Sequence, residues 1–126
     1  FYKNTVKSAC VFEGFIDFLS FKTLYPEVTK MNFLILNSTN QLKKGIDFLK
    51  KHNKIYCLLD NDIVGNKTTN IILELFPNNS IDKRKFYNKY KDINDYLIAM
   101  NKKNKGWLFL KKIILLYTLL LSLKNA

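Results

Sequence analysis

The sequence predicts an α/β fold in which a doubly wound, mainly parallel sheet carries helices on both faces. As far as Asn79, short apolar runs alternate with stretches whose apolar residues recur at helical spacing. The apolar runs are continuous rather than alternating, which is typical of parallel strands covered on both faces. In such sheets, ligands bind beyond the carboxyl ends of the strands.

The first unit is a strand at Ser8–Phe12, closed by Glu13-Gly14, and a helix over about residues 14–23. The helix is predicted from the spacing of its apolar residues. Pro26 ends the unit, because proline lacks the N–H that a continuing helix needs.

The second unit is a fully buried strand at residues 32–37, followed by a helix that Ser38 or Thr39 can cap. The apolar positions of this helix recur at helical intervals: Leu42, Ile46 and Leu49. Lysines on its other side indicate a solvated face first, and a phosphate contact only second.

The third unit is a buried strand at residues 54–59, ended by Asp60-Asn61-Asp62. Gly65 permits a turn, and a helix is predicted over residues 68–76, where Pro77 stops it. Glu13 and the Asp60/Asp62 pair therefore stand at the carboxyl ends of two strands, on one edge of the sheet.

Beyond Asn79 the periodicity weakens. A basic segment at residues 83–91 contains interleaved aromatic residues, and residues 92–97 open a short helix. We expect one domain over residues 1–100 and a helical tail over residues 101–126. The apolar part of the tail is interrupted too early by lysines to span a membrane, so it either packs on the domain, meets a missing neighbour, or follows a shifted reading frame.

The charge of the chain favours a polyanionic partner. There are 21 Lys+Arg against 10 Asp+Glu, a net charge of +11, which attracts nucleic acid. Arg84 is the only arginine, and the abundance of Lys, Asn and Ile is also what an AT-rich genome produces. The predicted nucleic-acid contacts are Lys83, Arg84, Lys85, Lys89 and Lys91.

The cysteines and the histidine give no sign of a zinc site. Cys10 and Cys57 lie in apolar runs, outside any C-x-x-C pattern, and are expected to be buried in the core. Free cysteines of this kind indicate a protein of a reducing compartment, such as the cytoplasm. His52 lies in a polar stretch and is predicted to be a surface residue near a helix end. The chain opens with Phe1, without a signal peptide, and resembles an internal fragment.

Four of the ten acids form two tight pairs, Asp60 with Asp62 and Asp92 with Asp95. Clustered carboxylates destabilise one another unless a cation lies between them. Mg²⁺ binds a few carboxylates and keeps several waters, which suits a D-x-D at a strand end. Capping of a helix or turn by Asp60 and Asp62 is the equally weighted alternative.

Other phosphate and metal motifs fit this stretch poorly. A calcium-binding EF-hand loop starting at Asp60 would need an oxygen ligand at Val64 and a glutamate at Ile71. A P-loop needs a contiguous Gly-Lys-Ser/Thr, which residues 65–68 interrupt. The D-x-D resembles the nucleophile motif of haloacid-dehalogenase-like phosphatases, but that motif usually lies near the start of its domain.

The order of the motifs resembles the TOPRIM domain, a Rossmann-like fold shared by bacterial primases, topoisomerases and some nucleases. The chain carries E-G-x-x-D from Glu13 to Asp17, D-x-D-x-x-G from Asp60 to Gly65, and K-D-x-N-D-Y-L over residues 91–97. The last segment is similar to primases of bacteria and mobile genetic elements.

This resemblance implies roles for the acids. Glu13 is the expected general acid/base, Asp60 and Asp62 the ligands of Mg²⁺ or Mn²⁺, and Asp92 and Asp95 less direct members of the metal site. Asp17 is expected only to orient the first helix.

The resemblance also implies a function. We expect Mg²⁺-dependent nucleotidyl transfer by a DNA primase that uses a single-stranded DNA template and nucleotides. An upstream zinc-binding domain or helicase is the expected partner, and no membrane is. A TOPRIM nuclease, a topoisomerase fragment and an inactive remnant that binds nucleic acid are the alternatives.

Overall fold

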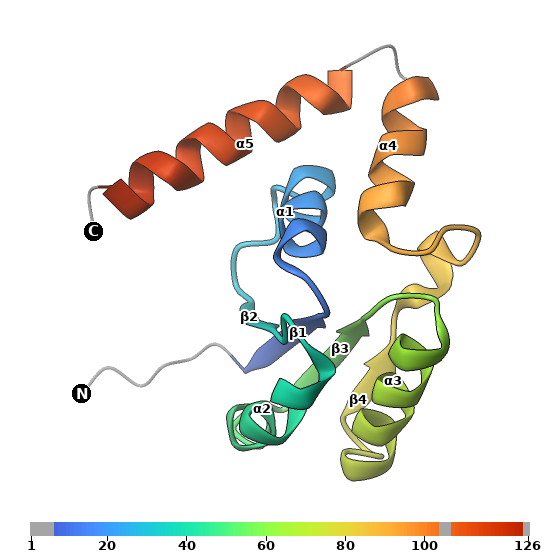
Figure 1. Ribbon diagram of the computed structural model, residues 1–126. Coiled ribbons are helices and arrows are strands. Elements are labelled where there is room, and N and C mark those ends of the chain that lie inside the picture. The colour runs from blue at the N-terminus through green and yellow to red at the C-terminus, as the bar shows by residue number, and fades with distance from the viewer. Residues whose placement is uncertain (1–6, 104–106, 125–126) are drawn as a thin grey trace.

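A four-stranded parallel sheet forms the centre of the computed structural model, which describes residues 7–103 and 107–124 (Figure 1). The strands are β1 (Ser8–Phe12), β2 (Asn32–Ile35), β3 (Lys54–Leu58) and β4 (Ser80–Asp82). Their order is β2-β1-β3-β4, and each neighbouring pair is parallel. The crossovers therefore pass along both faces of the sheet.

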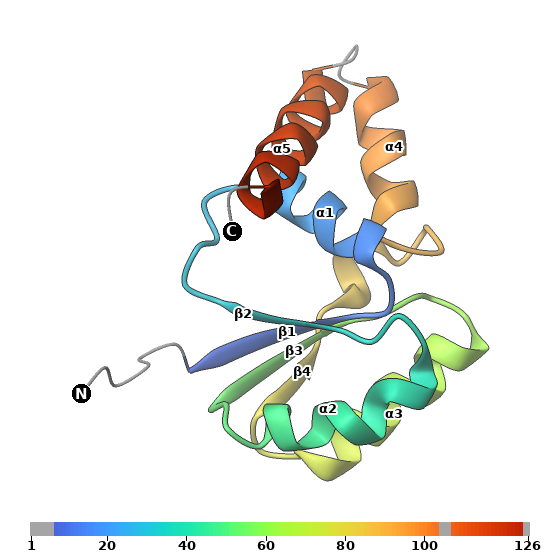
Figure 2. The same cartoon turned by 60° about the vertical axis from the view of Figure 1, so that its left-hand side comes forward.

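Helices cover both faces, as the sequence predicts (Figure 2). They are α1 (Phe15–Leu24), α2 (Leu42–Leu49), α3 (Ile63–Leu75), α4 (Ile93–Lys103) and α5 (Trp107–Lys124), with 3₁₀ turns η1 (Thr39–Gln41) and η2 (Arg84–Tyr87). One face carries α2 and α3, and the other carries α1 and α4. The predicted doubly wound α/β class is confirmed.

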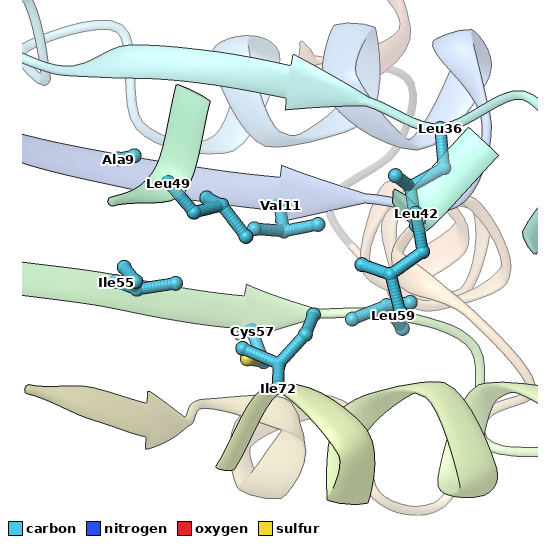
Figure 3. Close-up of a cluster of buried hydrophobic side chains, with 9 residues drawn as sticks. All are labelled: Ala9, Val11, Leu36, Leu42, Leu49, Ile55, Cys57, Leu59 and Ile72. Carbon is cyan, nitrogen blue, oxygen red and sulfur yellow. The ribbon is translucent and has the colours of Figure 1, made fainter. Parts of the chain in front are cut away.

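Alternate residues of the central strands build two separate cores. Val11 and Cys57 pack with α2 and α3 on one face (Figure 3), whereas Phe12 and Leu58 pack with α1 and the start of α4 on the other. This is the period of two that a strand imposes on its side chains. Both cysteines are buried and free, as predicted.

The strand β2 differs from its prediction. It ends at Ile35 instead of residue 37, and its residues are half-buried because it forms an edge of the sheet. Asn37 follows with a φ of 55°, a left-handed conformation that asparagine tolerates better than most residues. The Ser38 hydroxyl accepts a hydrogen bond of 3.2 Å from the Asn40 N–H, so it caps η1, which leads directly into α2. Gln41, the residue before α2, makes no side-chain capping bond.

The start of α3 was also predicted wrongly. The helix begins at Ile63, five residues before the expected position, because the Asp62 side chain accepts a hydrogen bond of 2.7 Å from the Gly65 N–H. Gly65 therefore lies in the first turn of the helix rather than in a loop.

His52 is not a surface residue, because only 6% of it is exposed. Its Nε2 lies 2.8 Å from the Asn32 amide nitrogen, and its Nδ1 lies 2.8 Å from the Phe48 carbonyl oxygen. The polar sequence around His52 gave no sign of these two contacts, which join the end of α2 to the edge strand β2.

The tail is helical as expected, and α5 packs against α1 and α4. The boundary expected at residue 100 falls inside α4. Residues 104–106 and 125–126 of the expected tail lie outside the described residues. No helix among residues 7–103 and 107–124 combines the length and the apolar character that crossing a membrane would require.

Candidate functional site

Five carboxylates from four segments of the chain meet at the carboxyl edge of the sheet. Glu13 follows β1, Asp60 and Asp62 follow β3, Asp17 lies in the first turn of α1, and Asp92 immediately precedes α4. Parallel strands end at a common edge, so the topology gathers residues that are up to 79 positions apart in sequence (Asp92 − Glu13).

Asp60 is the shared member of two acidic groups. Glu13, Asp60 and Asp62 form one group, and Asp17, Asp60 and Asp92 form the other, each with ligand atoms within 4.8 Å of one another. These distances suit simultaneous contact with a cation. Like charges at such spacing repel each other in its absence.

The environment of Asp60 favours a positive partner. Burial, together with the negative charges of Glu13 and Asp17, raises the pKa of its carboxyl to about 8. Its buried Oδ1 has no hydrogen-bond partner among residues 7–103 and 107–124. Unpartnered buried oxygens are uncommon, and an all-oxygen set of carboxylates is the donor set that Mg²⁺ or Mn²⁺ prefers. The residues therefore fit a divalent cation.

Main-chain hydrogen bonds hold two members of the first group in place. The Asp60 N–H donates to Glu13 Oε2 over 3.1 Å, which joins the ends of β1 and β3. Asp62 uses Oδ1 to cap α3 and still belongs to the group. Capping and cation binding, which the sequence left as alternatives, are therefore compatible for Asp62.

Asp92 and Asp95, the second acidic pair, have different places in the structure. Asp92 accepts a hydrogen bond of 2.8 Å from the Asp95 N–H and so caps α4. Asp95 is exposed, and among the described residues it belongs to neither acidic group. The structure thus brings Asp92, but not Asp95, to the other acids.

Asp17 has a more central place than the sequence suggested, since it is only 8% exposed and belongs to the second acidic group. Burial, together with the negative charge of Asp92, raises its pKa to about 6. Its place in the E-G-x-x-D motif was the available signal.

The segment that carries these acids matches a known protein family. The model described as Toprim-like matches residues 10–97. The chain belongs to the Toprim-like family. No curated protein and no solved structure matches it significantly.

The Toprim-like segment contains all five clustered acids, and α5 lies outside it. TOPRIM domains are usually parts of nucleic-acid enzymes and bind Mg²⁺ through acidic residues. The acidic cluster of this Toprim-like domain has the composition and spacing for that task.

Within the basic segment of the Toprim-like domain, the four predicted lysines are exposed: Lys83, Lys85, Lys89 and Lys91. Arg84 differs from them, because its side chain is only 13% exposed and forms a salt bridge of 2.8 Å with Asp82. Its guanidinium also donates to the Asp60 carbonyl oxygen and to the Asn66 side chain. Arg84 therefore braces the loop that carries Asp60.

Proposed function

We propose that this Toprim-like domain catalyses Mg²⁺-dependent nucleotidyl transfer on nucleic acid as the catalytic core of a DNA primase. The observation that carries the proposal is the unpartnered, buried Oδ1 of Asp60 inside a cluster of five carboxylates. A bound divalent cation would neutralise charge on a phosphoryl group and activate an attacking hydroxyl.

The acids divide the work by their positions. In one arrangement, the cation is held by Glu13, Asp60 and Asp62. In the other, it is held by Asp17, Asp60 and Asp92. Glu13 is half-buried at the end of β1 and is the proposed general acid/base. Asp95 contributes indirectly, because its N–H orients the Asp92 carboxylate.

The exposed lysines provide the proposed contacts to a single-stranded DNA template. They follow β4 and lead to Lys91, whose carbonyl oxygen accepts a hydrogen bond of 2.6 Å from the Asn61 N–H. The backbone of the basic segment therefore adjoins the acidic loop. Lysines bind phosphates without reading bases, so affinity should fall steeply as salt rises.

The resemblance of the K-D-x-N-D-Y-L segment to primases is the reason to favour primase over nuclease or topoisomerase. Its Asp92 lies in the acidic cluster, immediately before α4. We further propose that nucleotides are the second substrate, that an upstream zinc-binding domain or helicase completes the enzyme, and that it works in the cytoplasm. The alternative is an inactive remnant that binds nucleic acid.

The test is calorimetric titration with Mn²⁺ and Mg²⁺ of the wild type, Asp60→Asn and the control Glu74→Gln, an exposed acid on α3. We expect weak binding by the wild type and the control, and loss of binding in Asp60→Asn. Equal binding by all three proteins would remove the metal centre.

The activity itself is tested with this domain joined to the proposed upstream segment, on single-stranded DNA with nucleotides. Mg²⁺-dependent primer synthesis that disappears in Glu13→Gln would support primase. Cleavage of the DNA would point to a nuclease, and binding without either product would point to the remnant.

A further inference from the structure

Asn61 lies between two of the proposed metal ligands, but its side chain bonds to a different part of the chain. Its Nδ2 donates to the carbonyl oxygens of Tyr87 and Tyr90, over 3.1 and 2.9 Å. Its backbone N–H donates to the Lys91 carbonyl oxygen over 2.6 Å. One residue thus makes three hydrogen bonds to the five-residue segment 87–91.

This segment ends immediately before Asp92, the member of the acidic cluster that comes from farthest along the chain. Asp92 caps α4 through the Asp95 N–H, which orients its carboxylate relative to that helix. The cap does not determine where the start of α4 lies relative to β3. The bonds from Asn61 hold that position: its backbone N–H joins the residue after Asp60 to the residue before Asp92. Its side chain joins the same residue to Tyr87 and Tyr90, earlier in the segment.

A second contact anchors the other end of the segment. The buried Tyr87 hydroxyl donates to the Leu59 carbonyl oxygen over 2.7 Å. Segment 87–91 is therefore bonded to residues 59 and 61, on both sides of Asp60. Tyr87 contributes packing as well, whereas the Asn61 side chain contributes mainly its two N–H donors.

We propose that Asn61 is a positioning residue that places Asp92 in the metal centre. This inference rests on the proposed function, since it assumes that Asp92 helps to hold the cation. An amide is suited to the task because it supplies two donors to two carbonyl oxygens. Partners that orient metal ligands in this way are commonly worth about 10–100-fold in metal affinity.

The experiment compares Mn²⁺ affinity, measured by calorimetry, in the wild type, Asn61→Leu, Asp92→Asn and the double variant. Asn70→Leu, an exposed asparagine on α3, is the control for the substitution itself. We expect Asn61→Leu to weaken binding about 10-fold, and the double variant to bind no more weakly than Asp92→Asn alone. A loss of stability alone would not produce that non-additivity.

Asn61→Asp gives an independent test by the sign of its effect. If only local charge mattered, an added carboxylate would tighten Mn²⁺ binding. We expect weaker binding, because the new carboxylate oxygens would face the carbonyl oxygens of Tyr87 and Tyr90. If Asn61→Leu does not fold, Asn61→Ser replaces it in the cycle with the same expected non-additivity.

Two results would overturn the inference, and they are distinguishable. Wild-type affinity in Asp60→Asn would overturn the proposed metal centre and the inference with it. Lost binding in Asp60→Asn, together with unchanged binding in Asn61→Leu or additive losses in the double variant, would overturn the inference alone.

Discussion

Substitution of Gly65 by alanine should disturb the acidic loop directly. A Cβ at this position would lie 2.0 Å from the Asp60 carbonyl oxygen and 2.8 Å from the Asp60 carbonyl carbon. Ordinary contacts between carbon and oxygen are about 3.3–3.6 Å. The loop or the first turn of α3 must therefore move by about 1.3–1.6 Å, because backbone atoms cannot rotate away as a side chain can.

The size of the effect follows from two opposing contributions. Overpacking of this kind costs roughly 1–3 kcal/mol, and alanine recovers up to about 1 kcal/mol over glycine in a helix. We expect a net loss of about 1–2 kcal/mol in the free energy of unfolding. Because the moving atoms belong to Asp60, Mn²⁺ affinity should fall as well.

Urea denaturation and calorimetric titration measure these two quantities, and Gly45→Ala is the matched control. There the added Cβ would lie 2.7 Å from Leu34 Cδ2, the mobile end of a half-buried side chain. Gly45→Ala should keep wild-type stability and metal binding. Gly65→Ala with the stability and Mn²⁺ affinity of the wild type would refute the reasoning.

Three further outcomes are expected. The Asp60 carboxyl has an ordinary pKa of 3.8 and a folded pKa of about 8, so between these values the native state binds more protons than the unfolded state. Without divalent cations, stability should therefore fall as pH rises from about 4 to 8, and thermal denaturation should show a weaker slope in Asp60→Asn. His52→Ala should lower the free energy of unfolding, measured in urea, by about 1–3 kcal/mol, because it leaves the Asn32 side-chain amide and the Phe48 carbonyl without their partner. An unchanged value would show that water replaces the hydrogen bonds of the ring. Replacing the four exposed lysines of the basic segment by glutamine should reduce the salt dependence of single-stranded DNA binding by about 3 in the log–log slope. The same change at Lys43, Lys44, Lys50 and Lys51 of the α2 region should not, and equal effects would indicate non-specific attraction.

The sequence predicted three of the four strands, because their continuous apolar runs carry a strong signal. It could not predict that β2 is an edge strand, since strand order depends on contacts between distant segments. The strand β4 was missed because it has only three residues, two of them exposed. Its extended conformation depends on pairing with β3, which its own short sequence does not indicate.

The meeting of Glu13 with Asp60 and Asp62 was predictable, because both segments end parallel strands at one edge. The start of α3 was not recognised, because Asp62 was weighed as either a cap or a ligand. Asp62 caps α3 through Oδ1 and also belongs to the acidic group, so a choice between the two roles was unnecessary.

Asn61 and Arg84 show where residue type stops being informative. The positive charge of Arg84 predicts a phosphate contact, but it did not show that the guanidinium also forms a salt bridge with Asp82, two residues earlier. Asn61 bonds to main-chain carbonyl oxygens, which every residue possesses and no sequence pattern marks. An acidic motif can therefore point to the candidate ligands of a metal centre. The residues that position those ligands are recognised only in the folded structure, where distant segments of the main chain are in contact.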